Sequence, residues 1–283
     1  MKDRTTIGVR TRRLSMVLRR LRTESGLNAS QVAKLIGVSP STISRAESGK
    51  RGISRDDLAS MLTVYRVERR LRTALMKLHT DAQNPDLLDR GDLHVHEDLQ
   101  KWIGFELDAT RIRNYEPLLI PGLLQTFPYA RALFEVGDPS LNEQEIGDRV
   151  SARIARQSLL RRENPPRLDV ILHEAALRQR VGGAKIMGQQ LGYLIEVVAR
   201  PWITVRVIPT TAGAHAGMDG PFVIMDYADL PSLVHLENKV ASLYLDAKAD
   251  VKTYKLAYDS LLAVAYSPEQ SVELMGRIAG GMA

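Results

Sequence analysis

Cysteine is absent from all 283 residues, which excludes disulfide bonds, thiol nucleophiles and thiolate zinc ligands. No run of about 18 uninterrupted apolar residues occurs either, so we expect no membrane span. The first residues are charged throughout and contain no apolar core of the kind that a secretion signal needs. Together these absences favour a cytoplasmic protein.

Phe and Trp are scarce as well, with four Phe and two Trp in the whole chain. This scarcity argues against a ligand pocket lined by aromatic side chains. The sequence also contains no internal repeat and no low-complexity tract. Its length is long for one domain and ordinary for two, so we expect two domains.

Acidic residues are few only in the first quarter of the chain. Residues 1–72 hold 17 Lys and Arg against 6 Asp and Glu, whereas the remaining residues hold 22 against 27. A basic segment joined to a mildly acidic body is typical of nucleic-acid binding that is confined to one module. A basic surface that is merely solvated is the alternative that charge alone leaves open.

Four helices are predicted in this basic segment from the spacing of apolar residues and from residues that cap or end helices. The predicted stretches, with their flanking caps, are Thr11–Gly26, Asn28–Ile36, Ser39–Gly49 and Ser54–Tyr65. Pro40 suits the first position of the third helix, where a missing N–H breaks no hydrogen bond. Helical spacing continues over 66–80, so an all-helical domain is assigned to residues 1–80.

The second and third of these helices, joined at Gly37, form a helix-turn-helix pattern whose second helix presents small polar residues at its start. This pattern resembles the lambda-repressor and Cro-like family, the xenobiotic-response-element class of bacterial regulators. The matching residues are Ala33, Gly37, Val38, Ser39, Ile43, Ser44, Arg45, Glu47 and Gly49. The resemblance implies binding to double-stranded DNA.

We expect the exposed face of the third helix to read base edges. The predicted base-reading residues are Pro40, Ser41, Thr42, Ser44 and Arg45. Arg45 is the candidate for a bidentate contact to guanine, which is worth roughly 1–3 kcal/mol of discrimination. The glutamine that the family carries at the start of the preceding helix is replaced here by Ala29, so we expect more reliance on Arg45 and on DNA shape.

Phosphate contacts would fix the register of the module on DNA without reading its sequence. The residues predicted to make them are Arg10, Arg12, Asn28, Ala29, Ser39, Lys50 and Arg51. Glu47 would repel the DNA backbone, and the resemblance implies that it pairs instead with Arg22 as a structural bridge.

A polar stretch predicts a linker over 81–95, followed by a second domain over 96–283. His96–Glu116 is a long amphipathic segment that we expect to be helical, and strand patterns occur only after Arg167. The predicted strands are 167–172, 203–209, 221–227, 232–237 and 240–245, and the other predicted helices are 127–136, 143–162, 185–200, 250–264 and 268–278. The fold class is therefore mainly α and α+β overall, with an all-helical first domain and one small, mainly antiparallel sheet in the second.

The second domain resembles a family of actinobacterial regulators that carry a domain of unknown function after a repressor-like module. The residues that carry this resemblance are 116–133, RQSLL at 156–160, 173–183 and 205–227. Members of that family look like transcription regulators encoded beside small partner proteins, and some are antitoxin-like. The two resemblances together cover nearly the whole chain.

Catalysis and metal binding are weakly supported. The candidate residues are His173, Glu174, His215, Asp219 and Asp226. They are scattered rather than placed at ligand spacing, so we expect no metal, no cofactor and no enzyme. The loop 213–220 remains of interest, because His215, Met218 and Asp219 lie in a short stretch of small and polar residues that could contact an effector or a partner.

These observations predict a DNA-binding transcription regulator that acts as a homodimer, because one small recognition helix reads only a few base pairs. We expect the second domain to supply the dimer contact and to sense a small partner protein. A small-molecule metabolite is the alternative input, and an enzyme with a DNA-targeting head is the distant alternative.

Overall fold

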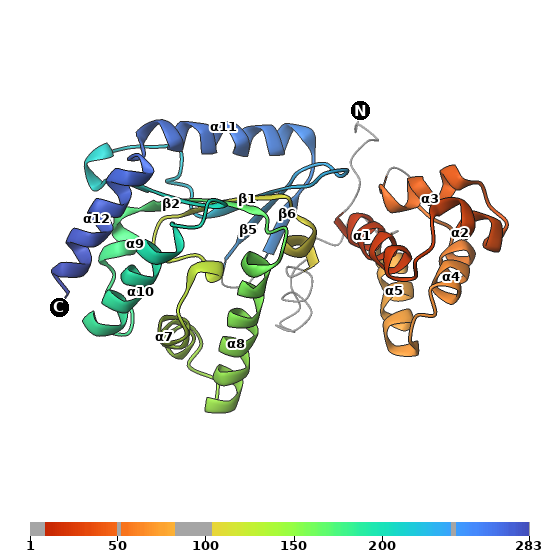
Figure 1. Ribbon diagram of the computed structural model, residues 1–283, viewed down its shortest axis with the longest axis horizontal. Helices are drawn as coiled ribbons and strands as arrows, with labels where there is room; N and C mark the ends of the chain where they lie inside the picture. Colours follow the sequence, from red (N-terminus) through yellow and green to blue (C-terminus); the bar gives the residue numbers. More distant parts are fainter. Residues whose placement is uncertain (1–8, 50–51, 83–103, 239–241, 283) are drawn as a thin grey trace. The chain divides into compact units, whose positions relative to one another are not determined.

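The computed structural model describes residues 9–49, 52–82, 104–238 and 242–282 (Figure 1). The chain divides into two units, residues 1–108 with 227–251 and residues 109–226 with 252–283. Most of the predicted linker, together with 96–103, falls outside the described residues. Among those described, no helix is both long and apolar enough to cross a membrane.

The first unit contains the predicted helical module. Its helices are α1 (Val9–Glu24), α2 (Ala29–Ile36), α3 (Pro40–Glu47), α4 (Arg55–Val64) and α5 (Arg69–Ala82). The predicted caps are confirmed, because the side chains of Asn28, Ser39 and Ser54 each accept a hydrogen bond from a backbone N–H in the first turn of the helix that follows. These bonds satisfy donors that a helix start otherwise leaves unpaired.

A single apolar core holds the five helices of this module together. Its fully buried members come from all of the helices, and they are Leu14, Leu18, Val32, Ala33, Ile43, Ala46, Ile53, Leu58, Met61, Leu62, Tyr65 and Leu75. Each helix is amphipathic and too short to be stable in water by itself, so burial of this shared face is what holds the helices in place.

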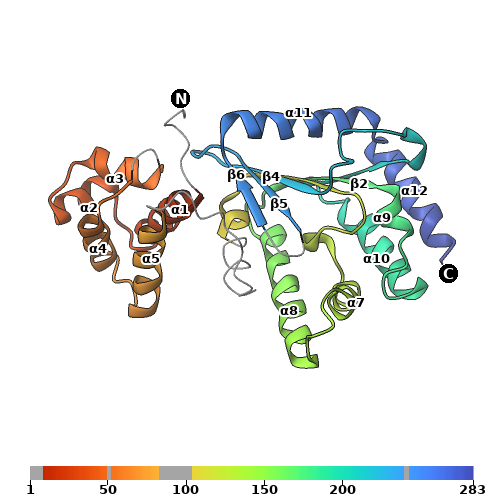
Figure 2. The same cartoon turned by 180° about the vertical axis from the view of Figure 1, so that it is seen from behind.

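The α+β fold class is confirmed, and the sheet has six strands in the order β3-β2-β1-β4-β5-β6. Figure 2 shows β2, β4, β5 and β6 of this sheet. The strands are β1 (Arg111–Glu116), β2 (Arg167–His173), β3 (Ile203–Ile208), β4 (Phe222–Asp226), β5 (Leu233–Glu237) and β6 (Ser242–Leu245). The sheet is mixed rather than mainly antiparallel, since β1 with β2 and β2 with β3 are parallel. The β1–β4 and β5–β6 pairs are antiparallel.

The expectation of helix up to Glu116 is wrong for its last part. Residues 104–108 are helical, but Arg111–Glu116 form β1 between β2 and β4. This strand is hard to recognise in the sequence because Arg113 and Asn114 are buried together with Ile112 and Tyr115. Polar residues therefore do not mark exposed positions along it. Arg113 tolerates burial because its guanidinium donates to Asp226 of β4 at 2.6 Å.

Helices cover both faces of the sheet in the second unit. α11 (Lys248–Val264) lies on one face, and α7 (Phe127–Gly137), α8 (Glu143–Arg156) and α10 (Ala184–Val197) lie on the other (Figure 1). The hydroxyl of Tyr258 in α11 donates to the carbonyl of Asp169 in β2 at 2.9 Å. α12 (Pro268–Gly280) packs against α10, while the short helix α9 (Glu174–Arg178) directly follows β2.

Candidate nucleic-acid interface

The turn between α2 and α3 depends on a left-handed glycine. Gly37 has φ 76°, a conformation that other residues adopt only with strain. The backbone N–H groups of Gly37 and Val38 both bond to the carbonyl of Ala33, which closes the end of α2. Ile43 and Ala46 of α3 are buried against this turn, so the opposite face of α3 is left exposed.

The exposed face of α3 consists of the residues that the sequence predicts for base reading. Pro40, Ser41, Ser44 and Arg45 are exposed and Thr42 is half-buried. The Oγ of Ser39 lies 2.8 Å from the Oγ of Ser41 and 2.9 Å from Oγ1 of Thr42, so these hydroxyls form one cluster at the helix start. Hydroxyls at this position can donate to phosphate oxygens or to base acceptors in the major groove.

Arg45 lies along the same face, held by the preceding turn of its own helix. Its Nε donates to the carbonyl of Ser41 at 3.1 Å, and its Nη2 lies 3.3 Å from the hydroxyl of Ser41. Both contacts are exposed, so DNA groups can replace them at little cost. The guanidinium is therefore held along the exposed face of α3.

The predicted pair between Arg22 and Glu47 is present. Arg22 Nε donates to Glu47 Oε1 at 2.7 Å, and Arg22 Nη1 donates to the carbonyl of Leu27 at 2.9 Å. The hydrogen bond to Glu47 raises the pKa of Arg22 above its usual value. Burial raises the pKa of the neighbouring Tyr65, and the Glu47 carboxylate adds to this effect. The pair ties α1 to the end of α3 and neutralises the charge of Glu47, whose side chain is nearly buried.

The residues predicted to contact phosphate lie in different environments. Asn28 and Ser39 are exposed and cap α2 and α3, and Ala29 is half-buried at the first position of α2. Arg10 is half-buried and already has a partner. Lys50 and Arg51 lie outside the described residues. Gln31 was not among the predicted residues; it completes the capping box of α2 by accepting from the Asn28 N–H, and the Asn-x-x-Gln spacing is its signal.

Arg12 does not fit the phosphate-binding role that the sequence predicts for it. Its side chain is 2% exposed, and its guanidinium donates to the carbonyls of Pro231 and Ser232. The guanidinium also lies 4.5 Å from the ring centre of Tyr227, and burial lowers its pKa. The prediction failed because these partners lie about 220 residues further along the chain, where a count of local charge cannot detect them.

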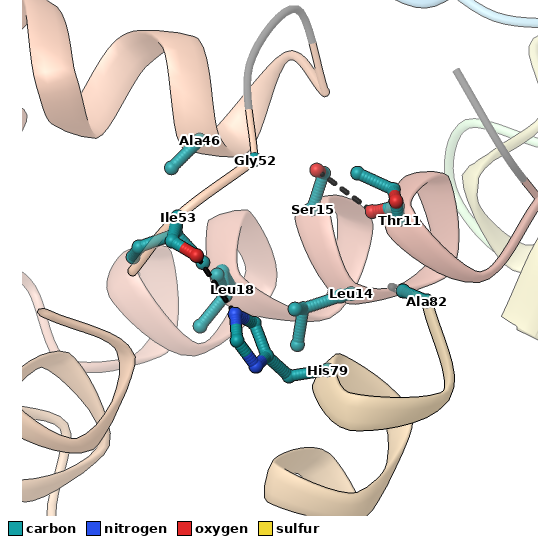
Figure 3. Close-up of a pocket in the computed structure, with 9 residues that line it drawn as sticks. All are labelled: Thr11, Leu14, Ser15, Leu18, Ala46, Gly52, Ile53, His79 and Ala82. Atoms are coloured by element: carbon teal, nitrogen blue, oxygen red, sulfur yellow. Dashed lines mark hydrogen bonds between the residues drawn. The ribbon is translucent and has the colours of Figure 1, made fainter. Parts of the chain in front are cut away.

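A small internal cavity lies behind α3 in the same module (Figure 3). Its volume is about 20 Å³, which is room for one water molecule. Beside it, Nε2 of the buried His79 lies 2.7 Å from the carbonyl of Ile53. This bond ties α5 to the segment that follows α3, so the cavity has a structural role and is too small for an effector.

The second unit brings two of the candidate residues of the predicted second domain together. The rings of His173 and His215 lie 5.6 Å apart, and His215 packs edge-on against Tyr115 with 6.1 Å between ring centres. Gly217 fits directly over Tyr115, since an added Cβ would lie 2.4 Å from its ring carbons. Met218 and Asp219 project from the loop and are exposed.

The carboxylates of Glu174 and Asp226 are bonded to other groups than these two histidines. Glu174 is bonded to Arg178 and to the backbone of Thr210, and Asp226 is bonded to Arg113 and Lys255. Nδ1 of His173 already accepts a hydrogen bond from the backbone N–H of Ala175, and Nδ1 of His215 accepts one from the N–H of Gly217. Among the described residues no group of three or more His, Asp or Glu side chains is arranged to hold a metal ion.

With this geometry in place, the comparisons with known proteins identify both parts of the chain. Residues 13–75 match a family model described as a helix-turn-helix domain, which supports a DNA-binding regulator. Residues 99–277 match the model described as "Domain of unknown function (DUF5753)", which covers more than half of the chain. The chain therefore belongs to the DUF5753 family. Searches of curated proteins and of solved structures found no match.

Proposed function

We propose that this protein is a transcription regulator that binds a double-stranded DNA operator through α3 and acts as a homodimer. The observation that carries the proposal is the exposed polar face of α3, with Arg45 and the Ser39–Ser41–Thr42 hydroxyl cluster, on a helix-turn-helix scaffold. The excess of basic residues over 1–72 supports it, because a positive module attracts phosphate whatever the sequence.

The homodimer is proposed from the size of the reading surface. α3 has eight residues and exposes two turns, which can contact only a few base pairs. Two copies bound to half-sites about one helical turn apart would contact more base pairs and so increase the discrimination between the operator and other DNA. We propose that the DUF5753 domain supplies the contact between the copies, so that a fragment of residues 1–80 binds one operator much more weakly than the full chain.

We propose further that the DUF5753 domain receives the regulatory input from a small partner protein, as in an antitoxin-like regulator of actinobacterial type acting in the cytoplasm. Support comes from three apolar side chains that stay exposed after β1 and at the start of α7: Leu118 at 53%, Leu119 at 41% and Phe127 at 49%. Exposed apolar groups of this kind are typical of protein–protein contacts. A metabolite as effector is the second candidate, and an enzymatic role the third.

The experiment that tests the core of the proposal is selection of bound DNA by the purified full chain from a random duplex pool. We expect an enriched site with two-fold symmetry and half-sites about 10 base pairs apart. Recovery of no sequence preference would contradict a sequence-specific regulator. Co-purification from the native cell, compared between the wild type and a Leu118→Ser, Phe127→Ser variant, tests the partner.

A further inference from the structure

A cleft with a volume of about 390 Å³ lies beside the C-terminal end of α12. Three arginines line it, Arg178, Arg180 and Arg277, together with Leu274, Ile278 and Met282. Three cationic side chains thus surround one space whose remaining wall is largely apolar. None of these residues belongs to the DNA-binding module.

Two arginines of the cleft come from one tight corner. Arg178 ends α9, and the chain then turns through Gly182 and Gly183, both with positive φ, into α10. Gly182 has φ 69°, a conformation that other residues adopt only with strain, so this corner favours glycine. The N–H of Gly183 donates to the carbonyl of Arg180 at 2.9 Å, which fixes the backbone that carries Arg180.

The charge in the cleft is not balanced. Arg178 is paired with Glu174, whose other carboxylate oxygen accepts from the backbone of Thr210. Neither Arg180 nor Arg277 has an ion pair within the described ranges of the chain, and both are exposed. Arg277 in the last turn of α12 has a favourable place at the helix end, but this does not account for Arg180, which lies outside α12.

We propose that this cleft binds a small organic anion that carries a phosphate or a pair of carboxylates on an apolar body. Guanidinium groups match the planar fork of carboxylate and phosphate oxygens and form charge-assisted hydrogen bonds with them. The half-buried side chain of Met282 provides the main contact for the apolar body, and the nearly buried Leu274 and Ile278 add the edges that they expose. The volume lies at the lower end of the range of metabolite sites, roughly 300–1,000 Å³.

The size and the charge both favour a small molecule over a macromolecule. Two unpaired guanidinium groups around a space of this volume suit a ligand of charge about −2, and a single short cleft leaves no extended track for a nucleic-acid backbone. Binding would not require DNA, so this inference stands or falls separately from the proposed DNA-binding function.

The test is isothermal titration of the full chain, without DNA, with phenyl phosphate and with inorganic phosphate as probes. We expect saturable binding of both, with phenyl phosphate tighter because its ring contacts the apolar wall. The Arg180→Gln and Arg277→Gln variants should each weaken binding of phenyl phosphate about tenfold, since each loses a charge-assisted bond. Arg161→Gln removes an exposed arginine elsewhere in the same unit and should leave binding unchanged.

A Met282→Ala variant separates the two parts of the site, because it should weaken phenyl phosphate and leave inorganic phosphate unaffected. Thermal unfolding of every variant checks that the exposed substitutions leave the fold intact. No binding of either probe by the wild type would overturn the proposal, as would equal losses in Arg161→Gln and Arg277→Gln. Weaker DNA binding in Arg180→Gln without any binding of the probes would also overturn it and would assign the cleft to DNA.

Discussion

Arg22 and Glu47 form an ion pair that joins the first helix of the DNA-binding module to the end of its recognition helix. The two side chains are 19% and 7% exposed, and 2.7 Å separates Nε from Oε1. Because Glu47 is nearly buried, its charge needs this partner, and the partner in turn fixes the angle at which α3 meets α1.

Arg22→Ala should therefore loosen α3 within the folded chain. Loss of the partner leaves a carboxylate nearly buried, and we expect the free energy of opening of α3 to fall by about 2–3 kcal/mol. Hydrogen–deuterium exchange of α3 amides in the full chain measures this fall, with exposed Arg20→Ala on the same helix as the matched control. Unchanged exchange in Arg22→Ala would mean that the pair contributes nothing to the position of α3.

Arg45→Ala should remove operator preference while keeping most non-specific affinity. Loss of a bidentate guanine contact reduces discrimination by roughly 1–3 kcal/mol, whereas the salt dependence should change by no more than one phosphate contact. Fluorescence anisotropy on operator and scrambled duplexes over a range of salt measures both quantities. Arg69→Ala, an exposed arginine on α5, is the control for charge. An equal loss on both duplexes would contradict base reading by Arg45.

Gly37→Ala should destabilise the helix-turn-helix without any steric clash. No atom lies within 4 Å of the place a Cβ would take, but φ 76° is unfavourable for alanine by about 1–2 kcal/mol. Gly52→Ala in the same module has equal room and no positive φ, so it serves as the matched control. The rate of hydrogen exchange of the α2 and α3 amides should rise in Gly37→Ala and not in Gly52→Ala. A similar rate in the two variants would show that backbone strain at Gly37 is not the cause.

The free energy of unfolding should fall as the pH is lowered, because His173 becomes protonated. Burial lowers the pKa of His173, the neighbouring His215 lowers it further, and Glu174 partly opposes this. The folded state therefore binds the proton less readily than the unfolded state, so stability present at neutral pH is lost as pH falls below about 6.5.

Unfolding of the full chain in urea between pH 5 and 8 measures this loss for the DUF5753 domain. His173→Gln should flatten the pH dependence, since it removes the titrating group and keeps a polar side chain at the start of α9. Lys185→Gln, an exposed substitution in the same unit, is the control for general effects of mutation. The same slope in wild type and His173→Gln would rule out His173 as the source.

Most of the helices, though not α9, and five of the six strands follow from local patterns. Caps at Asn28, Ser39 and Ser54, the glycine at 37 and the β-branched runs after Arg167 each act within a few residues, so they can be recognised in the sequence. The missed strand β1 is different. Its polar residues are buried because Asp226, more than 100 residues away, accepts from Arg113.

The sequence by itself determined the helix-turn-helix, its exposed polar face and the basic charge of the module, because capping, apolar spacing and composition are local properties. Only the tertiary structure decided that Arg12 is buried under Pro231 and Ser232, that β1 lies in the middle of a mixed sheet, and that Arg180 and Arg277 line the same cleft. Each of these depends on residues far apart in the chain, which come together only when the elements pack around a shared core.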